Sequence, residues 1–200
     1  CGYFSGQPAC MKLCEAEKQG TAPVQKQIFN VLPSLVNAEF ASDVTTEDKE
    51  FIIQGIAAMD FYLQKWFGKS TNKPSGLRVG AGAPADMGEG SQVKTENGVV
   101  TILMETGSFV WKRQSQSNKE VGGEWRPRLA AHEYVHVYQH QNGCTKDAVL
   151  KWFGEGMAEW LSYKATIDAG QLPKLSISQF NIQQAKQVAG SLKSFEDPNI

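Results

Sequence analysis

The sequence predicts an α+β fold in which a small twisted β-sheet packs against a long helix, with further helices on its flanks. An apolar run at residues 99–104 predicts the strongest strand. The segment 126–141 predicts the long helix, because Pro127 suits a first helical turn and Gly143 suits an end. Two hundred residues are enough for one domain with its own hydrophobic core.

Composition and charge exclude several classes of function. The formal net charge is −1, so nothing in the overall charge attracts nucleic acid or an anionic membrane surface. No apolar run is long enough to span a membrane. We therefore expect a monomer without a transmembrane segment and without a nucleic-acid partner.

The chain divides into an N-terminal extension with a helix, residues 1–44, and a main domain, residues 45–200. The chain starts with Cys1 instead of methionine, which predicts that a leader has been removed or that the chain is trimmed. Two disulfides in three alternative pairings would use all four cysteines, which are Cys1, Cys10, Cys14 and Cys144. This favours an exported location: secreted, periplasmic or at the cell surface. Two alternatives stay open, namely free buried cysteines and a lipid anchor on Cys1.

Two helices are expected before the first strand. Residues 24–40 carry apolar residues at helical spacing, and Pro33 is predicted to kink or split this helix. Thr45 or Thr46 is expected to cap the next helix, and Gly68 to end it. The core-facing side of that helix is predicted to carry Ile52, Ile56, Met59, Leu63 and Trp66.

The sheet is expected to contain strands at residues 77–80, 99–104 and 109–112. The segment 81–98, rich in glycine, is predicted to be a loop, and it ends in an Asn97-Gly98 turn signal. Residues 114–123 are polar and lack periodicity, so a second loop is predicted there.

The long helix carries an H-E-x-x-H motif at His132, Glu133 and His136. On a helix the two histidines lie on one face, about 40° and about 6 Å apart, so both imidazoles can reach one metal ion. Glu133 can reach a water molecule held by that ion, which makes it the expected general base. The motif therefore predicts a catalytic zinc site.

A catalytic zinc ion usually takes three protein ligands, so a third is needed beside the two histidines. Glu155 is the best candidate, because it opens a second helical pattern after a turn. Glu159 lies one turn further on the same face and is expected to hydrogen-bond the outer nitrogen of a ligating histidine. His140 shares the histidine face, but it would lie about 12 Å from His132, too far to share the ion. We interpret His140 as a wall or surface residue.

These two motifs resemble those of the gluzincins, metallopeptidases whose third zinc ligand is a glutamate on a separate helix. The gap between His136 and Glu155 is similar to that in aminopeptidase N-like enzymes. The sequences R-L-A-A-H-E at residues 128–133 and W-F-G-E-G-M-A-E-W at residues 152–160 are similar to peptidase-MA-like domains of secreted proteins. The resemblance covers about residues 45–164. It implies a zincin-like fold and one zinc ion, held by His132, His136 and Glu155.

Two more candidate residues follow from the resemblance. Aminopeptidase N-like enzymes hold the substrate's free amine with the glutamate of a Gly-x-Met-Glu-Asn strand, and here only the pair Met104-Glu105 matches. We interpret Glu105 as a solvated residue at a strand end. The family's oxyanion donor is a tyrosine well after the glutamate ligand, but no tyrosine follows Tyr163 here. Tyr163 is expected to face either the cleft or the core, so the oxyanion donor stays unassigned.

The sequence therefore predicts a zinc peptidase that acts on peptides or proteins. The strand at residues 99–104, if it edges the cleft, is expected to hold an extended peptide by strand addition. Two alternatives stay open: a secreted binding or scaffold domain with a non-catalytic zinc site, and a zinc hydrolase of a non-peptide amide or ester. The intact Glu133 argues against the scaffold, because a purely structural site needs no base.

Overall fold

A computed structural model gives the fold of much of the chain. The residues it describes are 29–68, 71, 73–82, 90–121, 124–143 and 151–172, without the side chains of residues 116–121, 151 and 152. All four cysteines lie outside these residues, and so do the predicted disulfides. Within the described ranges, no helix is long and apolar enough to cross a membrane.

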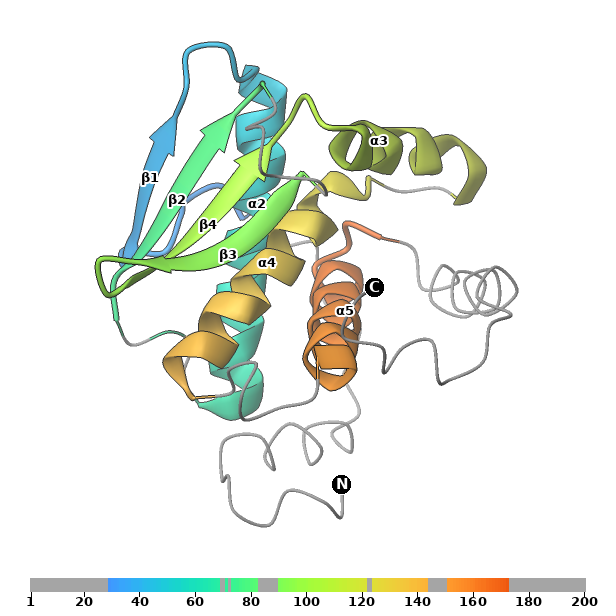
Figure 1. Ribbon diagram of the computed structural model, residues 1–200. Coiled ribbons are helices and arrows are strands. Elements are labelled where there is room, and N and C mark those ends of the chain that lie inside the picture. Colours follow the sequence, from blue (N-terminus) through green and yellow to red (C-terminus); the bar gives the residue numbers. More distant parts are fainter. Residues whose placement is uncertain are drawn as a thin grey trace.

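A mixed sheet of four strands forms one layer of the described fold (Figure 1). The strands are β1 (Val36–Phe40), β2 (Ser75–Gly80), β3 (Ser91–Glu96) and β4 (Val99–Glu105). Their order across the sheet is β1-β2-β4-β3, so β1 and β3 are the edges. The pairs β1/β2 and β2/β4 are parallel, whereas β3 and β4 are antiparallel neighbours in a hairpin.

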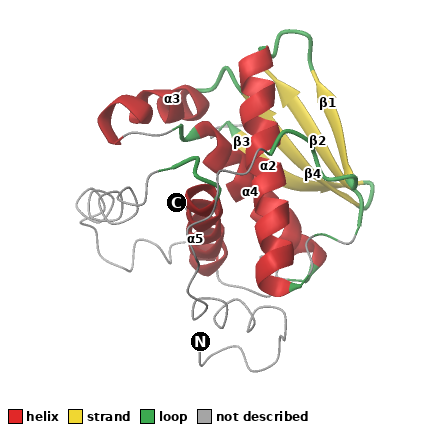
Figure 2. Cartoon of the chain, turned by 180° about the vertical axis from the view of Figure 1, so that it is seen from behind, coloured by secondary structure: helices red, strands yellow, loops and turns green. Residues whose placement is uncertain are grey.

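Four helices complete the part of the chain that the structure describes, and this confirms the predicted α+β class. They are α2 (Thr46–Phe67), α3 (Phe109–Val121), α4 (Arg126–Gln141) and α5 (Lys151–Asp168). Helices α2 and α4 cover one face of the sheet, and α5 packs against both of these helices (Figures 1 and 2). Helix α4 is therefore held between the sheet and α5, so side chains of α4 can contact both.

The hydrophobic core fills the space between the sheet and its helices. The apolar stripe of α2 is buried as predicted, although Trp66 is only partly buried. Thr45 caps α2 by accepting a hydrogen bond from the Asp48 amide, and Gly68 ends the helix in the left-handed conformation. From the sheet, the buried residues of this core include Leu77, Val79, Ile102 and Met104.

The prediction of a helix over residues 24–40 is wrong for residues 29–40, since residues 29–35 are not helical and Val36–Phe40 forms strand β1. Residues 24–28 lie outside the described residues. Pro33 begins a turn here, in which its carbonyl accepts a hydrogen bond from the Val36 amide. Residues Val36–Phe40 then pair with β2, whose strand begins at Ser75. This partner is distant in sequence, so the local apolar spacing carried no sign of the pairing.

Two further predictions near the sheet are also wrong. Residues 109–112 do not form a strand, because they begin α3, and this helix runs through most of the loop predicted at 114–123. The Ser108 hydroxyl caps α3 by accepting a hydrogen bond from the Trp111 amide at 3.1 Å. This N-terminal cap outweighs the preference of the Phe-Val-Trp run for extended structure.

Strand β4 pairs with β2 on one side and with β3 on the other, and β3 lies in the segment predicted to be a loop. Strand β3 has Val93 as its one apolar residue, so it lacks the usual apolar signal. The predicted Asn97-Gly98 turn forms, with φ angles of 50° and 79° that favour a tight hairpin. Strand β4 is consequently an inner strand, and the prediction that it edges a cleft and takes a peptide is wrong.

Candidate metal centre

Helix α4 presents the two motif histidines on the side that faces α5. The helix begins and ends where the sequence predicted, with Pro127 in its first turn and Gly143 beyond its end at a φ of 76°. The side chains of His132 and His136 are only 12% and 16% exposed. Their surroundings are therefore largely desolvated, which strengthens every electrostatic interaction they make.

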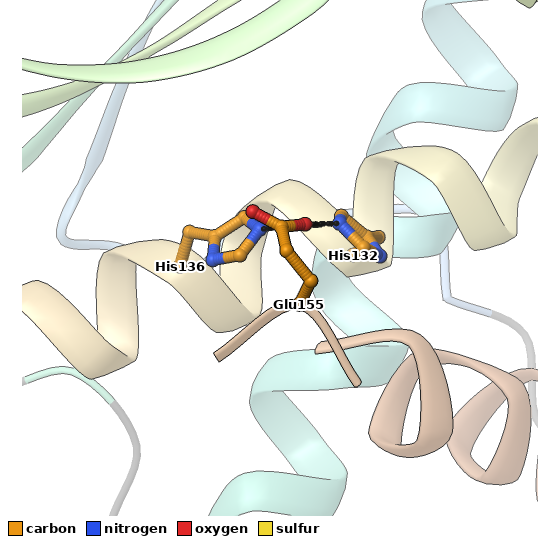
Figure 3. Close-up of side chains that lie close together, drawn as sticks. All are labelled: His132, His136 and Glu155. Carbon is orange, nitrogen blue, oxygen red and sulfur yellow. Dashed lines mark hydrogen bonds and ion pairs between the residues drawn. The ribbon is translucent and has the colours of Figure 1, made fainter. Parts of the chain in front are cut away.

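Glu155 reaches the two histidines from the second turn of α5 (Figure 3). Its Oε2 atom lies 3.4 Å from His132 Nε2 and 3.4 Å from His136 Nε2, and the two Nε2 atoms are 3.1 Å apart. These three residues, called the His-His-Glu cluster below, are the ones the sequence proposed as metal ligands. The Glu155 side chain is 51% exposed, so the cluster opens to solvent on the side of α5.

The outer nitrogen of each imidazole faces an acceptor. His132 Nδ1 lies 3.1 Å from Glu159 Oε2, as the sequence predicted, and His136 Nδ1 lies 2.8 Å from Gln139 Oε1. Each Nδ1 therefore donates a proton, because neither facing oxygen can. When the rings are neutral, both Nε2 atoms turn a lone pair toward the Glu155 carboxylate.

Three lone-pair donors that converge in this way repel one another unless a positive charge lies among them. A tetrahedral zinc ion with ligands at about 2.0–2.1 Å places them about 3.3 Å apart, close to the separations in the cluster. Two neutral imidazoles and one carboxylate are also a donor set that zinc prefers. The described residues therefore fit a zinc ion, with one position left for water.

The charges around His132 favour a cation at the same place. Burial lowers the pKa of His132, but hydrogen bonds to Glu155 and Glu159 outweigh it and raise this pKa to about 9. When the rings are protonated, their hydrogen bonds to Glu155 hold the pKa of this carboxyl well below its usual range. Burial raises the pKa of Glu159, yet Arg128 and His132 lower it to about 2. Both carboxylates are thus ionised at neutral pH.

The Glu133 side chain contacts the edge strand β3. Its Oε1 atom accepts a hydrogen bond of 2.8 Å from the Ser91 hydroxyl, and the residue is only 6% exposed. Its negative charge acts on His132, where it favours the protonated ring. The predicted general base therefore lies next to the cluster, on the side of the sheet.

The three remaining candidates take different positions. His140 is partly exposed in the last turn of α4, in keeping with its interpretation as a wall or surface residue. Tyr163 is buried in a small apolar cluster, apart from the main core, where it packs edge-to-face on Trp125. The interpretation of Glu105 as solvated is wrong, because it is 2% exposed at the end of β4, and burial raises its pKa.

Sequence reasoning missed three residues that contact the candidate site: Ser91, Arg128 and Gln139. Arg128 Nη1 lies 2.6 Å from Glu159 Oε2, the same oxygen that faces His132. Gln139 lies three residues after His136, and this spacing was a signal that could have identified it. Nothing local could have identified Ser91, since its partner Glu133 lies 42 residues away.

Comparisons with known proteins add no family to this description. No protein-family model, no curated protein and no solved structure matches the chain.

Proposed function

We propose that the chain is a zinc-dependent peptidase of the gluzincin type with a zincin-like fold. The observation that carries the proposal is the convergence of His132 Nε2, His136 Nε2 and Glu155 Oε2 within 3.4 Å of one another. A group of acceptors at these separations, partly buried and open on one side, is suited to a catalytic zinc ion and poorly suited to a site without a cation.

Each residue of the site has a role in this proposal. His132, His136 and Glu155 bind the zinc ion, and Glu159 orients the His132 ring through Nδ1. Zinc supplies a Lewis acid that polarises the scissile carbonyl and lowers the pKa of a bound water to about 7. The Glu133 carboxylate accepts the proton of the attacking water and passes it to the leaving amine.

The edge strand β3 is the surface that supports a peptide substrate. Its outer edge has no neighbouring strand within the described sheet, and its Ser91 contacts the proposed base. A peptide that pairs with β3 therefore passes close to Glu133. This role replaces the one predicted for the strand at residues 99–104.

Two measurements test the proposal. Elemental analysis should find one zinc ion per chain, and His132→Ala, His136→Ala and Glu155→Ala should each lose or severely weaken it. With a broad peptide library as substrate, Glu133→Gln should keep zinc and fold while losing hydrolysis by at least about 10²-fold. Glu50→Gln, a change at an exposed position on α2, is the matched control and should behave as wild type.

The outcomes separate the proposal from its rivals. A wild-type protein that binds zinc, but has no chelator-sensitive activity on peptides, amides or esters, would favour the scaffold. Chelator-sensitive cleavage of amides or esters alone would favour a non-peptide hydrolase. A chain that takes up no zinc would remove the premise of all three.

A further inference from the structure

The side chain of Gln139 joins the two helices that carry the His-His-Glu cluster. It projects from α4 and is only 3% exposed. Its Oε1 atom lies 2.8 Å from His136 Nδ1, and its Nε2 atom donates a hydrogen bond of 2.9 Å to the Gly154 carbonyl on α5. Gly154 directly precedes Glu155 in the chain. The Gln139 amide therefore contacts His136, one proposed ligand, and Gly154, the residue next to Glu155.

The Gly154 carbonyl determines which way this amide faces. A carbonyl oxygen can only accept, so the NH2 group of Gln139 must face it. The amide oxygen is then left for His136 Nδ1, which must donate the proton of that bond. His136 is thereby held in the tautomer whose Nε2 carries a free lone pair, the form that a metal ion requires.

The two histidines are oriented by chemically different groups. His132 faces the carboxylate of Glu159, which is shared with Arg128, whereas His136 faces a neutral amide. A neutral partner orients the ring without adding another negative charge to a site that already holds Glu155 and Glu159. The amide also keeps a free NH2 group for α5, which a carboxylate in its place would lack.

We propose that Gln139 is a positioning residue that sets the tautomer of His136 and holds the Glu155 segment of α5 against α4. The inference rests on the proposed zinc site, because its consequence is metal affinity. One side chain acts on two of the three ligands, so its loss should weaken zinc binding by about 10- to 100-fold, as for other groups that orient metal ligands.

Two variants separate the two hydrogen bonds. Gln139→Leu removes both of them at similar volume. Gln139→Glu keeps an acceptor for His136 Nδ1 but cannot donate to the Gly154 carbonyl. Gln141→Leu is the matched control, because Gln141 is a glutamine on the same helix whose amide bonds the Lys73 backbone.

Three readouts are needed, and two of them use metal-free protein. Nitrogen-15 shifts of the His136 ring should show a protonated Nδ1 in wild type and in Gln139→Glu, and a loss of this preference in Gln139→Leu. Hydrogen exchange in the first turns of α5 should be faster in both variants than in Gln141→Leu. Competition with a chromophoric chelator should give weaker zinc binding in both variants, by about 10- to 100-fold in Gln139→Leu.

A folded Gln139→Leu that keeps wild-type zinc affinity would overturn the inference, and so would a wild-type His136 ring with its proton on Nε2. If Gln139→Leu fails to fold, Gln139→Glu and the wild-type ring shifts decide the question. A wild type that binds no zinc would refute the proposed function instead, and the metal-free readouts would still test the two hydrogen bonds of Gln139.

Discussion

The Ser91 hydroxyl lies 2.8 Å from Glu133 Oε1, and this hydrogen bond joins the edge strand β3 to helix α4. The bond restrains the carboxylate that the proposed mechanism uses as its base. It also places that carboxylate beside the strand on which a peptide is proposed to lie. Ser91 is therefore the residue through which the sheet contacts the proposed chemistry.

Ser91→Ala should lower the kcat of peptide hydrolysis by about tenfold, because the charged Glu133 carboxylate loses the hydrogen bond that the Ser91 hydroxyl donates to it. Zinc affinity should stay unchanged, because the hydroxyl contacts Glu133 and not the three ligand atoms. Ser91→Thr keeps the hydroxyl and should restore most of the rate. Steady-state kinetics of the three proteins, each loaded with one zinc equivalent, provide the check. An equal loss in the Ala and Thr variants would show that packing, and not the hydroxyl, matters.

Glu159→Ala should weaken zinc binding by about 10- to 100-fold, since the His132 ring loses its partner. It should also destabilise the fold by about 1–3 kcal/mol, because Arg128 is buried and would lose its carboxylate. The double variant Arg128→Met with Glu159→Ala should recover part of this stability but not the zinc affinity. Denaturant unfolding and chelator competition measure the two effects separately. Recovery of both by the double variant would contradict the assigned role of Glu159.

The metal-free protein should become less stable as the pH rises above neutrality. The pKa of His132 is raised from 6.5 to about 9, so its stabilising contribution is full below pH 6.5 and is lost as the pH passes through about 9. Zinc takes the place of that proton, so excess zinc should remove the decline. Melting temperatures with chelator and with zinc, across this range, test the prediction. A melting temperature that, in the presence of chelator, is the same below pH 6.5 and above pH 9 would disprove it.

Gly55→Ala should destabilise the fold by about 1–3 kcal/mol through overpacking. A Cβ atom at this position of α2 would overlap the Pro127 carbonyl oxygen and lie 3.0 Å from the Ala130 side chain on α4. Gly156→Ala is the control, because nothing lies within 4 Å of the added atom. It should stabilise α5 by about 0.5–1 kcal/mol. Thermal unfolding of both variants measures the difference, and a neutral Gly55→Ala would mean that α2 and α4 pack less closely.

The sequence alone predicted the features that depend on neighbouring residues. The bounds of α4, the Thr45 cap, the left-handed Gly68 and the Asn97-Gly98 turn all follow from side chains within a few positions. The shared face of His132 and His136 follows from the helix period in the same way. Helical spacing also brought Glu159 into the prediction, one turn after Glu155.

Only the tertiary structure decided the features that depend on distant partners. Strand β1 exists because β2 pairs with it, and β3 is an edge because β4 lies inside the sheet. The approach of Glu155 to the histidines depends on how α5 packs against α4, and the spacing of residues along the chain does not determine that packing. Ser91 gained its contact with Glu133, and Gln139 its contact with Gly154, in the same way, since a hydrogen bond across two elements forms only when long-range packing brings the atoms within 3 Å.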